Sequence, residues 1–227
     1  CEQIKVNLGY MEEKITMIGL ASGLVLGNLG FTHCCIEDIG VLRSIPNLNI
    51  ISPSDSLETI KAVEASINSN KSCYIRVTGG TNNPIINNED YEFEIGKAVT
   101  LKKGEDITIF GSGAILGDCL KVADELKNKN ISAEVINMHT IKPIDREAVI
   151  NASKKSKLIV TVEEHNKIGG LGSAVSEVIS SLKDTPQQLI LGVNDFYAKS
   201  GSYNYLKSFY RLVPEKILED IEKILND

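Results

Sequence analysis

The sequence has little of what a membrane protein, a disulfide-rich protein or a zinc protein needs. None of its apolar runs approaches the roughly 18 residues that a membrane-spanning helix requires, and no basic stretch followed by an apolar one marks a secretory signal. Its five cysteines are odd in number and form no CxxC pairs, which argues against a disulfide scaffold and a structural zinc site. We therefore expect a protein of the reducing cytoplasm with no membrane contact.

Positive charge and histidine are also scarce. The 24 lysines and arginines are outnumbered by 30 acidic residues, giving a net charge of −6, and the basic residues do not cluster. Binding to nucleic acid generally requires a basic face, so we expect no nucleic-acid partner. The chain has three histidines, His33, His139 and His165.

Strand-like and helical patterns alternate along the 227 residues. Apolar runs rich in β-branched residues predict strands near residues 15–19, 74–77, 107–111, 133–137, 158–162 and 189–193. Between them, Asp55 and Glu58 form a capping box that opens a helix carrying Ile60, Val63 and Ile67 at helical spacing. This alternation predicts an α/β fold with mostly parallel sheets covered by helices on both faces.

A polar stretch rich in Gly and Asn divides the chain into two such three-layer units. We place the first unit at residues 1–80, the linker at 81–94 and the second unit at 95–227. The first unit has few strands for its length and begins inside a helical pattern. We therefore expect it to be incomplete at its N-terminus, and to be completed by further residues or by another chain.

His33 is the first candidate functional residue. In the stretch GNLGFTH, Gly27 and Gly30 bracket a short turn before it. Glycine lets a backbone approach a ligand closely or adopt a positive φ, and histidine, with a pKa near 6.5, exchanges a proton at neutral pH. Spacing alone leaves two interpretations open: His33 is catalytic, or its ring caps the helix that begins near Glu37 and Asp38.

Arg76 is the second candidate, because it lies near the carboxyl end of the strand expected over residues 74–77. Ligands of open α/β sheets bind at that edge, and a guanidinium suits an anionic group. The alternative is a surface arginine that pairs with an acidic side chain. The vicinal pair Cys34 and Cys35 is expected to be small buried hydrophobes, and His139 is expected to have no special role.

Three stretches, in order, resemble the transketolase family. GNLGFTHCCIEDIGVLRSIPNLNIISPSD resembles its pyrimidine-binding domain. INMHTIKPID, VTVEEHNKIGGLGSAVSEV and the later DFYAKSGSYNYLKSFY resemble its C-terminal domain. The resemblance covers essentially the whole chain. EQI followed by GNLGFTH is most similar to the split transketolases, in which the N- and C-terminal parts are separate subunits.

The resemblance implies a thiamine diphosphate-dependent enzyme that transfers a two-carbon ketol unit between sugars or sugar phosphates. It implies that His33 is catalytic, facing the thiazolium ring and the substrate, and that Arg76 grips the sugar phosphate. It further implies that the diphosphate and Mg²⁺ are held by residues upstream of residue 1 and by an N-terminal partner subunit, with no metal site in this chain. The assembly is then expected to be a homodimer or a heterotetramer.

Other implications concern specificity and the second unit. Many transketolases have a histidine and an acid, both binding sugar hydroxyls, where this chain has Ala21 and Leu29, so the donor sugar stays open. Because the family's C-terminal domain does not hold the cofactor, residues 163–165 and 169–175 are expected to serve structure or subunit contact. A deoxyxylulose-phosphate synthase, a 2-oxoacid dehydrogenase beta subunit and a non-catalytic scaffold for a thiamine-binding partner are the alternatives.

Overall fold

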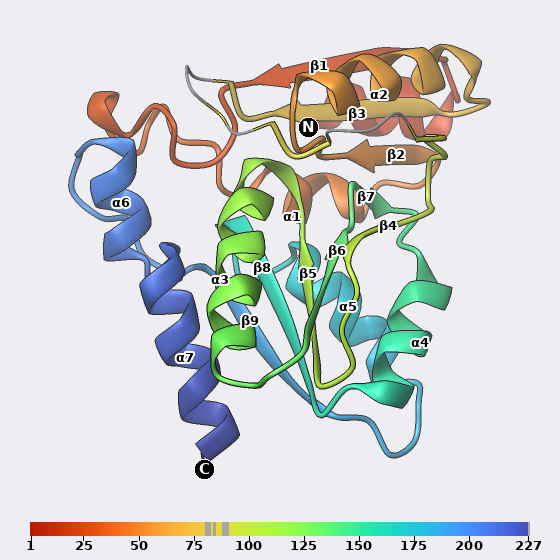
Figure 1. The fold of residues 1–227 in the computed structure, drawn as a ribbon. Coiled ribbons are helices and arrows are strands. Elements are labelled where there is room, and N and C mark those ends of the chain that lie inside the picture. The colour runs from red at the N-terminus through yellow and green to blue at the C-terminus, as the bar shows by residue number, and fades with distance from the viewer. Residues whose placement is uncertain (80–82, 84, 88–90, 227) are drawn as a thin grey trace.

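Two sheets and the helices that cover them make up the structure (Figure 1). The computed structural model describes residues 1–79, 83, 85–87 and 91–226. Its strands are β1 (Thr16–Leu20), β2 (Leu48–Ile51), β3 (Ser72–Val77), β4 (Val99–Lys102), β5 (Ile107–Gly111), β6 (Ala133–Asn137), β7 (Thr140–Lys142), β8 (Leu158–Asn166) and β9 (Gln187–Val193). Its α-helices are α1 (Asp38–Arg43), α2 (Ser56–Asn68), α3 (Leu116–Asn128), α4 (Arg146–Lys155), α5 (Leu171–Ile179), α6 (Tyr203–Phe209) and α7 (Pro214–Asn226). Shorter segments are a π-helix at Ile4–Tyr10 and 3-10 turns at Gly27–Leu29 and Gly113–Ile115.

The first sheet has the strand order β1-β3-β2-β7. Its first three strands are parallel, and β7 pairs antiparallel with β2. Because β7 follows β6 in the chain, a strand of the second unit completes the sheet of the first. α1 packs against the face that carries Leu48 and Ile50, and α2 packs against the face that carries Cys73 and Ile75.

The second sheet has the order β4-β6-β5-β8-β9, with β4 antiparallel and the rest parallel. α3 and α7 cover one face, while α4 and α5 cover the other (Figure 1). The predicted α/β class with two mostly parallel sheets is confirmed, and all six predicted strands are present. The short strands β2, β4 and β7 were not predicted.

The two units share one apolar core. Ile39 and Leu42 of α1 and Ile50 of β2 belong to the same buried cluster as Ile159 of β8 and Val175 of α5. Figure 1 shows α1 at the place where the two units meet. Burial of apolar side chains is the dominant favourable contribution to folding, so the relative placement of the units is set by packing.

The expected linker, residues 81–94, falls partly outside the described residues, since 81, 82, 84 and 88–90 are not described. The backbone N–H groups of Ile86 and Asn87 donate to Asp55 Oδ2 at 2.9 and 2.8 Å. The hydroxyl of Tyr91 donates to Glu58 Oε1. The described parts of this segment are therefore hydrogen-bonded to the first turn of α2.

α2 begins as predicted, and of its expected apolar residues Val63 packs against the buried core while Ile60 and Ile67 do not. Asp55 is its N-cap, accepting from Glu58 N at 2.9 Å. Ile60 and Ile67 lie at 58% and 64% exposure, because Ala62 and Ser66 instead face the sheet. Leu20 of the edge strand β1 is 75% exposed. Within the described residues, no helix combines the length and apolarity that crossing a membrane would take.

Candidate active site

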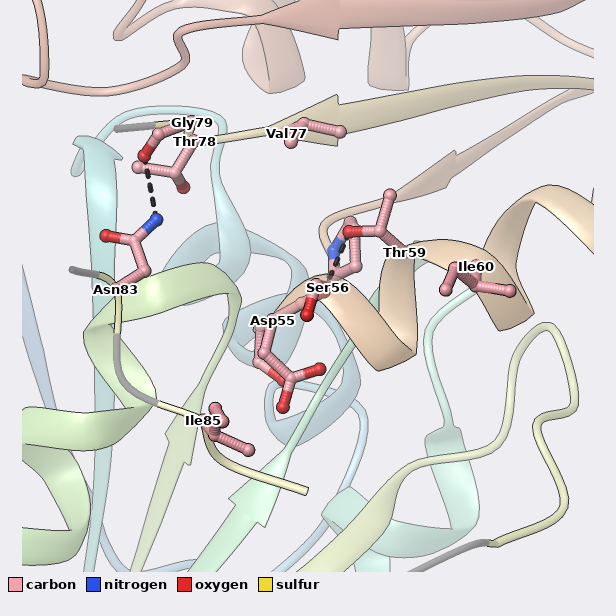
Figure 2. A pocket seen from close by; sticks show the side chains of 11 residues that line it. Asp55, Ser56, Thr59, Ile60, Val77, Thr78, Gly79, Asn83 and Ile85 are labelled. Carbon is pink, nitrogen blue, oxygen red and sulfur yellow. Dashed lines mark hydrogen bonds between the residues drawn. The ribbon is translucent and has the colours of Figure 1, made fainter. Parts of the chain in front are cut away.

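The carboxyl ends of β1 and β3 lie side by side and border a pocket, which is lined by neither His33 nor Arg76. The N–H of Ser22 donates to Val77 O at 3.1 Å, and the Ser22 hydroxyl lies 3.4 Å from Thr78 Oγ1. A pocket of about 460 Å³ lies at this edge, beside the N-terminus of α2 (Figure 2). Asn83 Nδ2 donates to Gly79 O at 2.7 Å on its rim. This edge of the sheet is where parallel α/β sheets bind ligands.

The segment from Gly27 to His33, which we call the His33 loop, leaves the same edge. Gly30 has φ +88°, a conformation that disfavours side chains, so the glycine expected to adopt a positive φ does so. The N–H of His33 donates to Gly30 O at 3.0 Å. The ring of His33 is exposed, and its Nδ1 lies 3.0 Å from Thr32 Oγ1. The hydrogen bond described for the His33 ring is to the neighbouring Thr32 and not to a backbone group of α1, whose N-cap is Glu37, so the described contacts do not favour the alternative in which His33 caps this helix.

The His33 loop is anchored on the second unit. A Cβ on Gly27 would collide with Leu206 of α6, and Gly201 N donates to Gly27 O at 3.1 Å. The ring of Phe31 lies 5.4 Å from that of Tyr197, in the tilted geometry that aromatic pairs favour. The loop therefore bridges the two units.

His139 and His165 are unsuited to proton transfer. Both are fully buried, and burial lowers the pKa of each to about 4. His139 stacks on Phe93 with ring centroids 4.2 Å apart, and His165 Nε2 accepts from Gly40 N at 3.2 Å. Both rings are therefore neutral near pH 7, and among the three histidines only His33 reaches solvent.

This difference predicts how stability depends on pH. In the unfolded chain each histidine binds a proton near pH 6.5, whereas His139 and His165 stay neutral in the folded chain down to about pH 4. Stability is therefore lost as pH falls from 6.5 to 4, by about 2 kcal/mol per histidine at pH 5. His139→Phe retains an aromatic ring against Phe93, and its melting temperature should fall less between pH 7 and pH 5 than that of the unmodified chain. Glu163, whose pKa burial raises to about 7, has the opposite pH dependence in both proteins and cancels in the comparison. Equal falls in the melting temperatures of the two proteins would contradict the conclusion that His139 is neutral in the folded chain.

Arg76 is placed differently from the expectation of a guanidinium at the mouth of a site. The residue is 3% exposed. Its Nε lies 2.8 Å from Asp38 Oδ2, and the Tyr74 hydroxyl donates to the same oxygen at 2.8 Å. Its assignment to a sugar phosphate stays a prediction. Asp38 is the acidic partner that the alternative expected, but the arginine is buried and not at the surface.

The acids at the end of β8 also make contacts within the chain. Glu163 accepts from Leu171 N and Gly172 N at 2.7 and 2.8 Å, and so caps α5. Glu164 accepts from the Tyr203 hydroxyl, and its Oε2 lies 3.4 Å from Leu24 N. The role of residues 163–165 in subunit contact stays a prediction.

The vicinal cysteines are not poised for redox chemistry. Cys34 is buried and Cys35 is partly buried, and both are free thiols. Burial raises the pKa of both thiols, that of Cys35 to about 11. Reactive cysteines are exposed and have a lowered pKa, so the interpretation of this pair as small hydrophobes is consistent with their surroundings.

Sequence reasoning missed how Asp38 and Tyr74 take part in this region. Asp38 is the first residue of α1 and binds both Arg76 and Tyr74. The period of two along β3 puts Tyr74 and Arg76 on one face and Cys73 and Ile75 on the other. That pattern directs both polar side chains away from α2 and toward α1. It was the sequence signal from which their contact with α1 could have been predicted.

Similarity to known proteins places the chain in a family. The profile of the transketolase pyrimidine-binding domain matches residues 1–81, and that of the transketolase C-terminal domain matches residues 96–217. One of the subunits of apulose-4-phosphate transketolase from Phocaeicola vulgatus is 36% identical over 216 residues, covering 95% of this chain and 69% of the relative. The 6-deoxy-6-sulfo-D-fructose transketolase subunit SqwH of Clostridium sp. is 33% identical, covering 99% and 69%. A solved structure described as a split-gene transketolase, an inactive beta4 tetramer, superposes with a TM-score of 0.88 at 30% identity, covering 99% of this chain and 71% of that one. The chain therefore belongs to the transketolase family and is similar to the C-terminal subunits of its split members.

Proposed function

We propose that this chain supplies the substrate-facing histidine and the C-terminal domain of a split, thiamine diphosphate-dependent transketolase. The observation that carries the proposal is His33, exposed on a glycine loop at the carboxyl edge of a parallel sheet. The loop is fixed by both units, so its position does not depend on a ligand. In the assembled enzyme His33 donates a proton to, or accepts one from, a substrate oxygen as charge moves on and off it.

Mg²⁺ accompanies the cofactor's diphosphate and is held by oxygen ligands such as carboxylates. In the residues that the structure describes, no three His, Cys, Asp or Glu side chains gather as a metal ion would require. We therefore infer that Mg²⁺ and the diphosphate are held by an N-terminal partner subunit. When bound, thiamine diphosphate supplies a carbanion equivalent that takes up and releases the two-carbon unit.

The substrate class follows from the relatives. The substrates named for the two curated relatives differ, one a phosphate and one a sulfonate, and both carry an anionic group. We propose a sugar with an anionic end group as the substrate and leave its carbon skeleton open. We also propose an assembly with more than one copy of each subunit, because the solved relative is described as a tetramer.

Calorimetry tests the division of labour between the subunits. The isolated chain, titrated with thiamine diphosphate and Mg²⁺, should show no binding with a Kd in the micromolar range, because its described residues gather no cluster of side chains that would hold the metal. Adding the N-terminal partner should produce binding. Micromolar binding by the chain alone would contradict the proposal.

Reconstitution tests the activity. The chain, its N-terminal partner, thiamine diphosphate and Mg²⁺ should together transfer a ketol unit from a ketose phosphate to an aldose phosphate. Omission of this chain or of the cofactor should abolish the transfer. Full transfer by the partner and cofactor without this chain would make it a scaffold.

A further inference from the structure

A segment of the second unit lies over the His33 loop. Residues 196–210, which we call the clamp, follow β9 and include α6, and they belong to the stretch DFYAKSGSYNYLKSFY. α6 packs against the 3-10 turn at Gly27–Leu29, which begins the loop (Figure 1). The clamp therefore brings the C-terminal half of the chain to the candidate catalytic residue.

The closest approach of the clamp is at Gly27. A Cβ on this glycine would lie 2.1 Å from Leu206 Cδ1 and 2.8 Å from Gly201 O. Gly201 N in turn donates to Gly27 O at 3.1 Å. Leu206 is fully buried and belongs to the same apolar cluster as residues of α3 and α7. The space beside Gly27 is therefore filled by a side chain that the core of the second unit holds in place.

A second contact between clamp and loop is aromatic. The ring of Phe31 lies 5.4 Å from that of Tyr197 and 6.1 Å from that of Tyr210, distances at which aromatic pairs attract one another. The Tyr210 hydroxyl accepts from Ala198 N at 2.8 Å and donates to Phe196 O at 2.9 Å. Both rings that face Phe31 therefore belong to a segment that is hydrogen-bonded to itself.

The clamp also reaches the start of the loop. The Tyr203 hydroxyl donates to Glu164, whose Oε2 lies 3.4 Å from Leu24 N, and Leu24 O accepts from Gly27 N at 3.0 Å. The ring of His33, by contrast, is exposed, and its described hydrogen bond is to the neighbouring residue. The backbone of the loop therefore decides where the ring lies, and the clamp contacts that backbone on both sides of the turn.

We propose that the clamp positions His33 for catalysis, with Leu206 and Tyr197 as the positioning residues. A proton-transfer group must lie within hydrogen-bonding reach of the atom that it serves, and a misplacement of about 1 Å can cost about 100-fold in rate. Leu206 fixes the turn that begins the loop, and Tyr197 fixes the ring of Phe31 near its end. The catalytic consequence rests on the proposed function, whereas the structural consequence, a loop held by the clamp, does not.

Hydrogen exchange on the isolated chain tests the structural consequence. Gly27→Ala places a methyl group where Leu206 lies, so the loop must move away from the clamp. Gly30 N and His33 N report this change, because they donate within the loop to Gly27 O and Gly30 O, each at 3.0 Å. Their exchange should speed up by at least about tenfold, while exchange in α4, on the other face of the second sheet, stays unchanged.

Tyr197→Ala is the second variant, which decides the question if Gly27→Ala folds poorly. Tyr197 is 68% exposed, so its truncation removes the contact with Phe31 and leaves the core intact. Exchange at His33 N should speed up by about two- to tenfold, as expected for the loss of one aromatic pair.

Two substitutions of the same kinds are the matched controls. Gly172→Ala places a methyl group 2.5 Å from Ile190 Cγ2, a comparable collision between α5 and β9. Tyr10→Ala truncates another exposed tyrosine, which precedes β1, whereas the loop leaves the carboxyl end of that strand. Neither control should change exchange in the loop. Unchanged exchange in both of the first two variants would overturn the proposal, and so would an equal acceleration in the controls.

Kinetics of the reconstituted complex test the catalytic consequence. Gly27→Ala should lower kcat by at least about tenfold and change KM less than about twofold, because a misplaced proton-transfer group weakens binding of the transition state more than binding of the substrate. Gly172→Ala should retain most of the activity. Added to His33→Ala, Gly27→Ala should cost little more, because it acts through His33.

An undiminished kcat in Gly27→Ala would overturn the proposal, and so would an equal loss with and without His33. If the unmodified complex shows no transfer at all, the proposed function fails, and the exchange experiment still decides whether the clamp holds the loop.

Discussion

His33→Ala in the reconstituted complex is expected to lower kcat by about 100- to 10,000-fold, the range typical of a lost proton-transfer group. The ring is exposed, and its one hydrogen bond among the described contacts is to the neighbouring Thr32. Its removal should therefore leave the melting temperature of the isolated chain nearly unchanged. Steady-state kinetics and thermal unfolding, measured on the same preparation, check the two halves of this prediction.

Asn28→Ala is the control for His33→Ala. Asn28 is an exposed polar residue of the 3-10 turn that begins the His33 loop, so its truncation alters the loop surface without changing His33. It should retain most of the activity. A His33→Ala complex with full kcat but lower stability would show that the histidine serves the fold.

Asp55→Ala is expected to cause a large loss of stability. Asp55 accepts from Glu58 N as the cap of α2, and from the N–H groups of Ile86 and Asn87 and the Asn87 amide. Losing a cap costs about 1 kcal/mol, and each buried donor left unpaired costs about 1–3 kcal/mol. We expect unfolding free energy to fall by about 3–5 kcal/mol, measured by urea denaturation.

Asp145→Ala provides the comparison for Asp55→Ala. Asp145 caps α4 through Ala148 N at 3.0 Å and also accepts from Ala98 N at 2.9 Å. It thus satisfies two backbone groups, whereas Asp55 satisfies three and a side-chain amide besides. Asp145→Ala should therefore lower the free energy of unfolding less than Asp55→Ala does, by about 1–3 kcal/mol. Equal losses would mean that the segment around Asn87 is not held by Asp55.

The sequence predicted the parts of the fold that carry strong local signals. The N-cap at Asp55 and six of the strands are local patterns, and all are present. β7 is three residues long and pairs with β2, which lies about 90 residues earlier. No local pattern encodes such a pairing, so β7 could not be predicted.

The sequence indicated which residues belong to the candidate site, but not which side chains and backbone groups they contact. The glycines around the His33 loop and the chemistry of histidine pointed to His33, and the structure leaves its ring exposed. The direction of Arg76 depends on which face of β3 meets α1, and its partners are the acid of one helix and the carbonyls of two other segments. Those contacts arise only when both units are packed together, which a linear pattern does not show.

The catalytic role of His33 is tested most directly by carbethoxylation of the isolated chain, followed by reconstitution. Diethyl pyrocarbonate should modify His33 and spare His139 and His165, because these two are fully buried; peptide mapping identifies the site. Since the partner never meets the reagent, its own histidines cannot confound the assay. We expect the modified chain to assemble with its partner but to transfer no ketol unit, and we expect hydroxylamine to restore the activity. Full activity from a chain whose His33 is shown to be carbethoxylated would contradict it.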